Sequence, residues 1–285
     1  MSTEEHSSQA GRIGVFNRAA ATYDSIGPRF FTHLGQRLVE LSHITPGATV
    51  LDVAAGRGAV LFAAANQVGP GGRAVGIDLA ENMVRETTAD IQGRGRHNVE
   101  MHHMSAEHID FPDASFDGVL CGFALWNFSP PHQALQEFFR VLKPGGRVGL
   151  TTWTDDCPFV TWVRQELRSS VPPQAPPAHS GSEAPSFGYF DTPAKLATAL
   201  QQTGFERIEI SIEDHDFVYA TDEEWWLSLW SHGMRSRFER LASPDLEQVR
   251  GDMLRKVQVL KQPDGIHALL RVLFALAYKP SQSLR

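Results

Sequence analysis

Two aspartates, each at the end of a predicted strand, are the residues best placed to do chemistry in this sequence. Asp52 ends the apolar run of VLDVAAGRG (50–58), and Asp78 ends a second run in GIDLAENM (76–83), about 20 residues beyond the intervening turn. A carboxylate at the Asp78 position can accept hydrogen bonds from both hydroxyls of a ribose. The turn after Asp52 is built of small residues that let the backbone approach a ligand: Ala54, Ala55, Gly56 and Gly58.

The turn after Asp52 also distinguishes two kinds of ribose-containing ligand. A nicotinamide dinucleotide usually needs G-x-G-x-x-G, because its pyrophosphate rests on the N-terminus of the following helix. Here the turn reads A-A-G-R-G-A-V, so the third glycine is missing. Asp52 would repel a pyrophosphate, whereas it suits a ligand that carries an ammonium and a sulfonium. The sequence therefore favours S-adenosyl-L-methionine and leaves a nicotinamide oxidoreductase as a weaker alternative.

Composition and charge exclude several other classes. The 285 residues include 26 basic and 33 acidic side chains, for a net charge of −7, which argues against a nucleic-acid partner. The two cysteines, Cys121 and Cys157, are too few for a disulfide framework and predict reduced thiols in a cytoplasmic protein. The polar N-terminus is unlike a signal peptide, and no apolar run is long enough to predict a membrane span.

Short apolar runs alternate with helical stretches, which predicts an α/β fold with a mostly parallel sheet and helices on both faces. Strands are expected over 48–54, 73–78, 98–104, 116–123, 147–153, 205–212 and 268–278. Helices are expected over 59–68, 80–92, 131–142, 191–204 and 222–260, and before the sheet on either side of a break at Gly27–Pro28.

Five regions follow from this pattern. They are a disordered tail (1–11), N-terminal lid helices (12–45), a Rossmann-like ligand-binding core (46–153), a flexible Pro/Ala/Ser-rich flap or insertion (154–190), and the end of the sheet (191–285). The last region contains a helical substrate cap over 222–260. The apolar N-terminal helices would also allow a homo-oligomer to form through them.

Five segments in order resemble the class I S-adenosylmethionine-dependent methyltransferases, and in particular those similar to the ubiquinone/menaquinone-biosynthesis methyltransferases. They are NRAAATYDSIG (17–27), VLDVAAGRG (50–58), GIDLAENM (76–83), MSAEHIDFPDASFD (104–117) and ALWNFSPPHQALQEFFRVLKPGG (124–146). The match covers roughly residues 13–153. It implies a Rossmann-like sheet of seven strands in the order 3-2-1-4-5-7-6, with the last strand antiparallel.

The resemblance implies a role for each matching residue. Asp52, with the backbone at Ala54 and Gly56, would face the methionine part of the cofactor, and Gly122 would meet its amine. Asp78 would hold the ribose. Leu79 and Met83 would pack against the adenine, and the adenine edge would be read by Ser105, Ala106 and Glu107. Tyr23 matches a tyrosine that folds over the cofactor.

The chain departs from the family pattern at two positions. Ala54 replaces the usual glycine, which is tolerable if the backbone there does not need a positive φ. Ser105 replaces the usual aspartate, so its hydrogen bond to the adenine amino group would lack charge assistance.

Each of these residues also has a purely structural interpretation. Asp78 could cap the following helix, Asp52 could stabilise the turn, and Tyr23 could pin the N-terminal helix to the body.

A metal site among the clustered histidines is disfavoured, because His102 and His103 are adjacent in a strand and point to opposite faces. Trp225, Trp226 and Trp230 are typical of core packing, although with Trp126 and Trp162 they could line an apolar pocket.

Methyl transfer from a sulfonium is an in-line displacement that depends mainly on alignment in a dry site. A hydroxyl or an acidic carbon acceptor would benefit from a base, for which Tyr23, His33 and His232 are candidates. With an alkene carbon as acceptor, aromatic faces could stabilise the resulting cation. Phe- and Trp-rich covering segments with little basic charge predict a small, largely apolar metabolite as substrate. The alternative function is cofactor binding without methyl transfer, or a cyclisation-type reaction.

Overall fold

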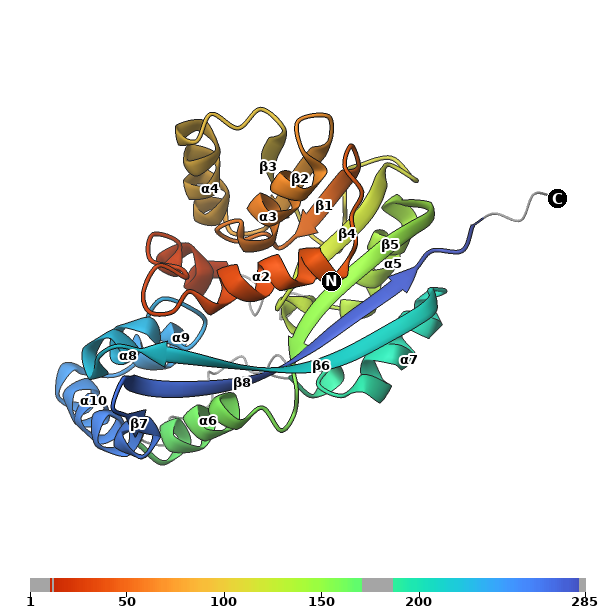
Figure 1. The fold of residues 1–285 in the computed structure, drawn as a ribbon. Helices are drawn as coiled ribbons and strands as arrows, with labels where there is room; N and C mark the ends of the chain where they lie inside the picture. The colour runs from red at the N-terminus through yellow and green to blue at the C-terminus, as the bar shows by residue number, and fades with distance from the viewer. Residues whose placement is uncertain (1–10, 12, 171–186, 282–285) are drawn as a thin grey trace.

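A computed structural model describes residue 11 and residues 13–170 and 187–281. Its centre is an eight-stranded sheet in the order β3-β2-β1-β4-β5-β8-β6, with the two-residue β7 paired to β8 (Figure 1). The strands are β1 (Thr49–Val53), β2 (Arg73–Asp78), β3 (Val99–His103), β4 (Phe116–Gly122), β5 (Leu142–Trp153), β6 (Glu206–Tyr219), β7 (Lys261–Gln262) and β8 (Gly265–Tyr278). Strands β1 to β5 pair in parallel, and β8 is antiparallel to both β5 and β6. The predicted order is confirmed once β7 is set aside.

Helices cover both faces of the sheet, as the continuous apolar strands require. The long helices are α2 (Phe30–Leu41), α3 (Ala59–Val68), α4 (Glu81–Gly93), α5 (Pro131–Val141), α6 (Pro158–Ser170), α7 (Pro193–Thr203) and α10 (Ser243–Lys256). Along β1, Val50 packs into a core cluster with α2 and α3, and its neighbour Leu51 packs into a second cluster with α5 and α7. The alternation of side chains along a strand thus divides the core into two halves.

The N-terminal segment enters the fold as two helical pieces. Residues 13–19 are helical, a series of turns follows, and α2 begins at Phe30. Gly27 lies in the turn with a φ of 80°, so the break expected at Gly27–Pro28 is present.

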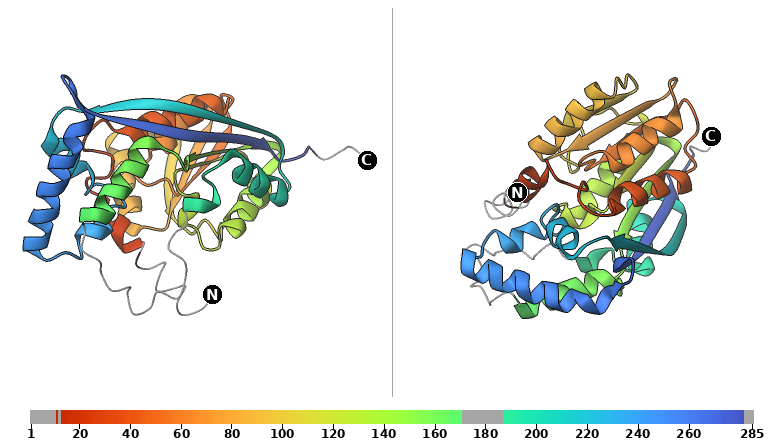
Figure 2. Two further views of the ribbon diagram at one scale, coloured as in Figure 1. Left: turned by 90° about the horizontal axis from the view of Figure 1, so that it is seen from below. Right: turned by 60° about the vertical axis from the view of Figure 1, so that its left-hand side comes forward.

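Strands β6 and β8 form a long antiparallel pair that extends past the rest of the sheet (Figures 1 and 2). Strand β6 continues to Tyr219, beyond the predicted end at residue 212. The added residues include the acidic Glu213, Asp214 and Asp216. An edge strand can carry such charged side chains because one of its sides faces solvent.

The far end of this strand pair is covered by helices from two parts of the chain (Figure 2). The expected helical stretch over 222–260 is divided into α8 (Asp222–Ser228), α9 (Arg235–Phe238) and α10, followed by a 3-10 turn at Val257–Leu260. Within the segment expected as a flap or insertion (154–190), residues 158–170 form α6. Val163 and Leu167 give α6 a buried stripe at i, i+4 spacing. Residues 171–186, like residues 1–10 of the tail expected over 1–11, lie outside the described residues.

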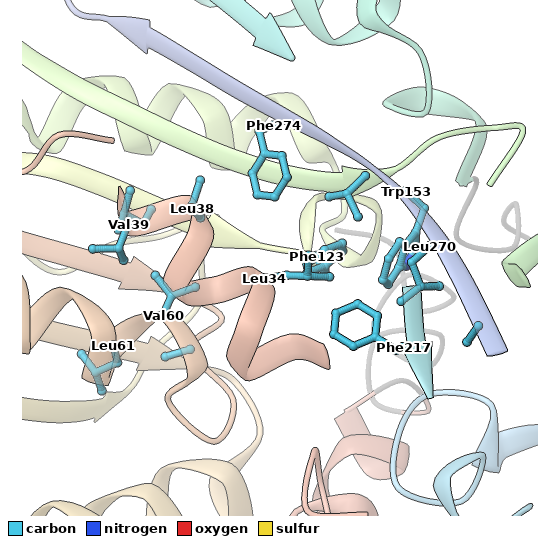
Figure 3. Packing of buried hydrophobic residues seen from close by; sticks show 14 of the residues in the cluster. Leu34, Leu38, Val39, Val60, Leu61, Phe123, Trp153, Phe217, Leu270 and Phe274 are labelled. Carbon is cyan, nitrogen blue, oxygen red and sulfur yellow. The ribbon is translucent and has the colours of Figure 1, made fainter. Parts of the chain in front are cut away.

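The cap is joined to the sheet by an apolar core. Figure 3 shows Leu34 and Leu38 of α2, Val60 and Leu61 of α3, and Phe123, Trp153, Phe217, Leu270 and Phe274 from the strands β4, β5, β6 and β8 and their ends. The rings of Phe123 and Trp153 are 4.2 Å apart between centroids. Two neighbouring strand ends therefore place an aromatic wall at the carboxyl edge of the sheet.

Candidate active site

A cavity of about 1170 Å³ lies at the carboxyl ends of β1, β2 and β4, between the sheet and the cap. This is the edge at which ligands bind in open α/β sheets. Its walls include most of the residues that the sequence analysis selected: Tyr23, Ala54, Gly56, Asp78, Leu79, Met83, Ala106, Glu107, Gly122 and His232. These residues come from the N-terminal segment, from the carboxyl ends of the parallel strands and the segments that follow them, and from the cap.

Asp78 holds the turn after β1 and also faces the cavity. One carboxylate oxygen accepts a hydrogen bond from the backbone N–H of Gly56 at 2.8 Å, and the other accepts from that of Ala80 at 2.8 Å. Burial raises the pKa of Asp78, and these two hydrogen bonds oppose the rise. Each carboxylate oxygen has a further lone pair, so the structural and ligand-binding interpretations are compatible.

Asp52 is 1% exposed and lies beside the large cavity, on a smaller one of about 80 Å³. The two cavities share walls at Tyr23, Ala54, Gly56 and Gly122. The Oδ2 atom of Asp52 is buried and has no hydrogen-bond partner among the described residues. Burial raises its pKa well above the usual range. A buried carboxylate oxygen without a partner is unusual in a folded protein and indicates a missing donor or cation.

The turn after Asp52 is strained at Ala54. The φ of Ala54 is 57°, in the left-handed region that alanine rarely adopts. Alanine was expected to be tolerable at this position if the backbone there did not need a positive φ, and that condition is not met. Gly56 and Gly58 have φ values of 52° and 79°, and an added Cβ at Gly56 would meet nothing within 4 Å. Beside the cavity, the loop is therefore open enough to admit a ligand.

Replacing Ala54 by glycine is expected to raise the free energy of unfolding by up to about 1 kcal/mol, because it removes the left-handed strain. Urea denaturation would measure the change. Ala55→Gly is the matched control. The neighbouring Ala55 has no positive φ, so this change should lower the free energy of unfolding by about 0.4–1 kcal/mol. A loss of stability in Ala54→Gly as large as that in Ala55→Gly would contradict the strain.

Ser105 is not on the cavity wall. Its hydroxyl donates a hydrogen bond to Oε2 of Glu107, and the backbone N–H of Glu107 donates to the Ser105 hydroxyl at 3.2 Å. The other oxygen, Oε1 of Glu107, accepts from the N–H of Ser129 at 2.8 Å. Ser105 therefore orients Glu107, and the expected direct contact from Ser105 to an adenine is not supported by this geometry.

The three candidate bases are in different surroundings. His33 lies outside the cavity, with its ring 5.3 Å from His215 and 5.4 Å from Phe217, because α2 turns this side chain toward β6. Tyr23 is on the cavity, but burial, followed by the charges of Asp24 and Asp78, raises its pKa and keeps the hydroxyl protonated. His232 is on the cavity, and burial lowers its pKa to about 4. Only His232 combines access to the cavity with a neutral, proton-accepting ring.

Asp24 positions the aromatic side of the cavity and was missed by the sequence analysis. Its carboxylate accepts hydrogen bonds from the backbone N–H groups of Phe31 at 3.2 Å and Thr32 at 2.8 Å, and from the Thr32 hydroxyl at 2.6 Å. These groups are in the first turn of α2, so Asp24 caps that helix from seven and eight residues away. The helix start then directs Phe30 and Phe31 into the cavity.

The tryptophans divide between the cavity and the core. Trp126 and Trp153 line the cavity, whereas Trp162, Trp225, Trp226 and Trp230 do not. Trp225 and Trp226 are buried in the cap core instead. Trp153 had not been selected from the sequence, although its place at the end of β5 is a signal of the same kind as Asp78 at the end of β2.

Within the described ranges, no group of three or more His, Cys, Asp or Glu side chains is arranged to hold a metal ion. No helix in the same part of the chain is both long enough and apolar enough to cross a membrane. Cys121 and Cys157 are buried free thiols.

Comparison with known proteins identifies the family. The model of the ubiE/COQ5 methyltransferase family matches residues 6–161. Nocamycin O-methyltransferase of Saccharothrix syringae is 36% identical over 238 residues, which cover 81% of this chain and 85% of that protein. The chain belongs to the ubiE/COQ5 methyltransferase family. It is therefore an S-adenosyl-L-methionine-dependent methyltransferase.

Two further proteins resemble this methyltransferase. Aklanonic acid methyltransferase DauC of Streptomyces sp. (strain C5) is 39% identical over 138 residues, which are 48% of this chain and 63% of that protein. The crystal structure of the [4+2]-cyclase SpnF matches with a TM-score of 0.55 and 21% identity over 88% of this chain and 82% of that chain. At this identity the second likeness shows the shared Rossmann-like fold.

The site of this methyltransferase fits S-adenosyl-L-methionine. The cofactor is cationic at its sulfonium and at its ammonium, and Asp52 presents a buried carboxylate oxygen that has no partner among the described residues. The ribose and adenine would find Asp78 and the apolar Leu79 and Met83 along the same wall. The donors and acceptors present therefore match the chemical groups of the cofactor.

Asp52→Asn is expected to stabilise the cofactor-free methyltransferase at high pH. Because the pKa of Asp52 is raised on folding, the folded chain holds a proton that the unfolded chain releases above about pH 3.9. The free energy of unfolding therefore falls as the pH rises above that value toward the raised pKa. The variant lacks this loss, so its melting temperature should exceed that of the wild type by a few degrees at pH 8 and by less at pH 4.

The same variant should bind S-adenosyl-L-methionine about tenfold more weakly at pH 8, because a charge attraction is lost. Calorimetric titration and thermal melting at the two pH values test both effects. The exposed Asp155→Asn is the control and should change neither. A stability difference between Asp52→Asn and the wild type that is the same at pH 4 and pH 8 would contradict the burial-driven titration.

Proposed function

We propose that this methyltransferase transfers the methyl group of S-adenosyl-L-methionine to an oxygen atom of a small, largely apolar metabolite. The observation that carries the proposal is one continuous cavity, lined by Asp78 and Met83 on the sheet side and by the aromatic rings of Phe30, Phe31 and Trp153 nearer the cap. Its volume of about 1170 Å³ exceeds the range of about 300–1,000 Å³ typical of a single ligand. Cofactor and acceptor would therefore share it.

The names of the relatives support this class of substrate. One relative is an O-methyltransferase named for nocamycin, and another is named for aklanonic acid. Both names denote small molecules, in agreement with a cavity whose walls are mostly apolar.

The residues on the sheet side would bind the cofactor. Asp78 would accept hydrogen bonds from the ribose, Leu79 and Met83 would pack on the adenine, and Glu107 with Ala106 would lie at the adenine edge. Asp52 would balance the cationic methionine part through the wall formed by Ala54, Gly56 and Gly122. Tyr23, stacked on Phe31 with 5.4 Å between ring centroids, would cover the cofactor from the lid side.

The cofactor, when bound, supplies a methyl group already activated by its sulfonium. The protein's part is to hold the acceptor in line, to exclude water with the aromatic wall, and to remove the acceptor's proton. His232 would take that proton, because its imidazole is neutral above about pH 4 and lies on the cavity. The proton would leave the acceptor oxygen for a ring nitrogen of His232.

Incubation with methyl-labelled S-adenosyl-L-methionine and a cell extract tests the proposal. The label should enter the small-molecule fraction, and His232→Gln should slow transfer about 10²-fold or more while the affinity for the cofactor stays unchanged. A label found only in protein or nucleic acid would overturn the substrate class. An unchanged rate in His232→Gln would overturn the base.

A second candidate function is a cyclisation-type reaction or cofactor binding without transfer, for which the fold shared with the cyclase SpnF is the specific observation. Cofactor binding by calorimetry together with no label in any fraction would favour it. The match to an O-methyltransferase over most of both chains favours methyl transfer.

A further inference from the structure

The imidazole of His232 is held without a hydrogen bond to its buried ring nitrogen. Nε2 is buried and has no hydrogen-bond partner among the described residues. The ring lies against Phe30 and Phe31, with 5.9 and 6.3 Å between ring centroids. A histidine that acts as a base is usually oriented by a hydrogen bond to one of its ring nitrogens. The orientation of this ring therefore depends largely on how its backbone and its apolar surroundings are fixed.

The backbone of His232 is fixed to α9. Its carbonyl accepts a hydrogen bond from the backbone N–H of Arg235, the first residue of α9, at 3.1 Å. The N–H of Glu239, just after α9, donates in turn to the carbonyl of Arg235 at 3.1 Å. Any group that holds the side chains of Arg235 and Glu239 therefore also holds the segment that carries His232.

A network of two arginines and a glutamate joins α9 to the first helical segment of the chain, residues 13–19 (Figure 1). Nε of Arg18 donates to both carboxylate oxygens of Glu239, at 2.8 and 3.0 Å, and its Nη2 donates to Oε2 at 2.5 Å. Nε of Arg235 donates to Oε1 of Glu239 at 2.6 Å, and its Nη1 donates to the backbone carbonyl of Arg18 at 3.0 Å. These contacts link positions that are 221 residues apart in the sequence.

This network is of a stronger kind than an ordinary surface ion pair. A single exposed pair contributes little, whereas bidentate contacts between arginine and carboxylate and networks of several charges are the exceptions. The side chains of Glu239 and Arg235 are only 20% and 25% exposed. The hydrogen bonds from Arg18 and Arg235 lower the pKa of Glu239 to about 2, so the carboxylate keeps its charge at neutral pH.

The first helical segment is also fixed to the sheet side of the cavity. The backbone N–H of Asn82, in the first turn of α4, donates to the side-chain oxygen of Asn17 at 2.8 Å. The side-chain amide of Asn82 donates to the carbonyl of Asn17 at 3.0 Å. Arg18 and Glu239 both line the cavity on which His232 lies. The segment therefore connects the start of α4, beside Asp78, to the part of the cap that carries His232.

We propose that Glu239, together with Arg18 and Arg235, is a positioning residue for methyl transfer that fixes the segment of His232 relative to the cofactor side of the cavity. This inference rests on the proposed function, in which His232 takes the proton of the acceptor. The network acts on His232 through the backbone. Its loss should therefore slow transfer, because small displacements of a reacting group are costly, and should leave cofactor affinity nearly unchanged.

The titration of the His232 ring reports on the network without any knowledge of the substrate. Burial lowers the pKa of His232 to about 4, so the ring should stay neutral between pH 5 and pH 8 in the wild type. Glu239→Ala should expose the ring to water and raise its pKa toward the ordinary value of about 6.5, inside this range. NMR of the full chain with nitrogen-15-labelled histidine measures this, and His232→Gln identifies the signals.

Methyl transfer provides the second readout. With labelled S-adenosyl-L-methionine and the extract used to test the proposed function, Glu239→Ala should slow transfer about tenfold. Its affinity for the cofactor, measured by calorimetry, should stay within about threefold of wild type. Glu239→Gln keeps the volume and one acceptor oxygen, so it should recover part of the rate. Arg18→Gln breaks the same contacts from the other segment and carries the test alone if Glu239→Ala does not fold.

Glu223→Ala is the matched control. Glu223 of α8 forms an ion pair with Arg250 of α10 at 2.6 Å, and neither residue is on the cavity wall. This variant also removes a paired carboxylate from the cap, but one that does not contact the segment of His232. The titration of His232, the transfer rate and the cofactor affinity should all stay as in the wild type.

A His232 ring that stays neutral between pH 5 and pH 8 in both Glu239→Ala and Arg18→Gln would overturn the positioning role. Equal effects of Glu223→Ala would overturn it too, and so would a raised pKa of His232 with an unchanged transfer rate. Failure of the proposed function is seen separately, as transfer at the wild-type rate in His232→Gln or as no label in small molecules, and this inference would fall with it. Slow transfer in His232→Gln with normal transfer in Glu239→Ala would remove the positioning role alone.

Discussion

Replacing Asp78 by alanine is expected to weaken the binding of S-adenosyl-L-methionine about 100-fold or more. In the cofactor complex that we propose, the carboxylate accepts hydrogen bonds from the ribose, and each hydrogen bond to a charged group contributes about 1.5–3 kcal/mol. The same carboxylate also accepts from the backbone N–H groups of Gly56 and Ala80. Its removal would therefore lose the ligand contact and also loosen the turn that forms the cavity wall.

Calorimetric titration of the two Asp78 variants separates these contributions. Asp78→Asn keeps an acceptor but loses the charge, and we expect it to weaken binding about tenfold. Asp117→Ala is a control for the loss of a carboxylate that supports the sheet, because Asp117 accepts from the N–H of Thr49 at 2.8 Å and from Lys143 at 2.8 Å, away from the cavity. It should lower stability and leave cofactor affinity unchanged. Cofactor affinity in a folded Asp78→Ala variant within about threefold of wild type would refute the ribose assignment.

Trp225→Ala is expected to lower the free energy of unfolding by about 3–5 kcal/mol. Trp225 is 0% exposed and lies at the centre of the cap core, with its ring 6.2 Å from that of Trp162. Truncation would leave a large cavity between α6 and α8. The loss is expected toward the lower end of the range, because the buried Nε1 of Trp225 has no hydrogen-bond partner among the described residues.

Urea denaturation with two companion variants tests this prediction. Trp225→Phe keeps most of the apolar volume and removes the indole N–H, so the expected loss is about 1–2 kcal/mol. Leu227, on the same helix, is 42% exposed, and Leu227→Ala should change stability by no more than about 0.5 kcal/mol. A loss below about 1 kcal/mol in Trp225→Ala would contradict the core assignment and revive the interpretation of this residue as part of a ligand pocket.

The sequence by itself determined the sheet and the edge of the sheet at which the cavity lies. The strands around Asp52 and Asp78 were predicted within a residue or two, because a short apolar run between turn-forming residues is a local signal. The carboxyl ends of parallel strands must meet at one edge, so two aspartates at strand ends sufficed to locate the cavity. The same rule, applied to Trp153 at the end of β5, would have placed the aromatic wall as well.

Only the tertiary structure decided which of the other candidates reach the cavity. His33 and His232 are both histidines in segments expected to cover the site, so the sequence does not distinguish them as candidate bases. In the structure, α2 directs His33 toward β6, whereas His232 of the cap lies on the cavity. The hydroxyl of Ser105 is used by Glu107, two residues away, and Ala54 adopts a φ that its residue type does not favour. These outcomes depend on which neighbouring groups in the folded chain interact with each residue, and a local sequence pattern carries no information about those neighbours.

The cap depended on tertiary structure most of all. Helix α6 was missed, and Arg164 and Arg237 are 73 residues apart in the sequence, so nothing in their spacing indicates that they share a wall. Both lie on the cavity because β6 and β8 extend past the sheet, and at this far end α6 packs against β8 and α10 (Figure 1). The periodicity of apolar residues predicts an element and its buried face, whereas the packing of whole elements against one another decides which side chains share a cavity wall.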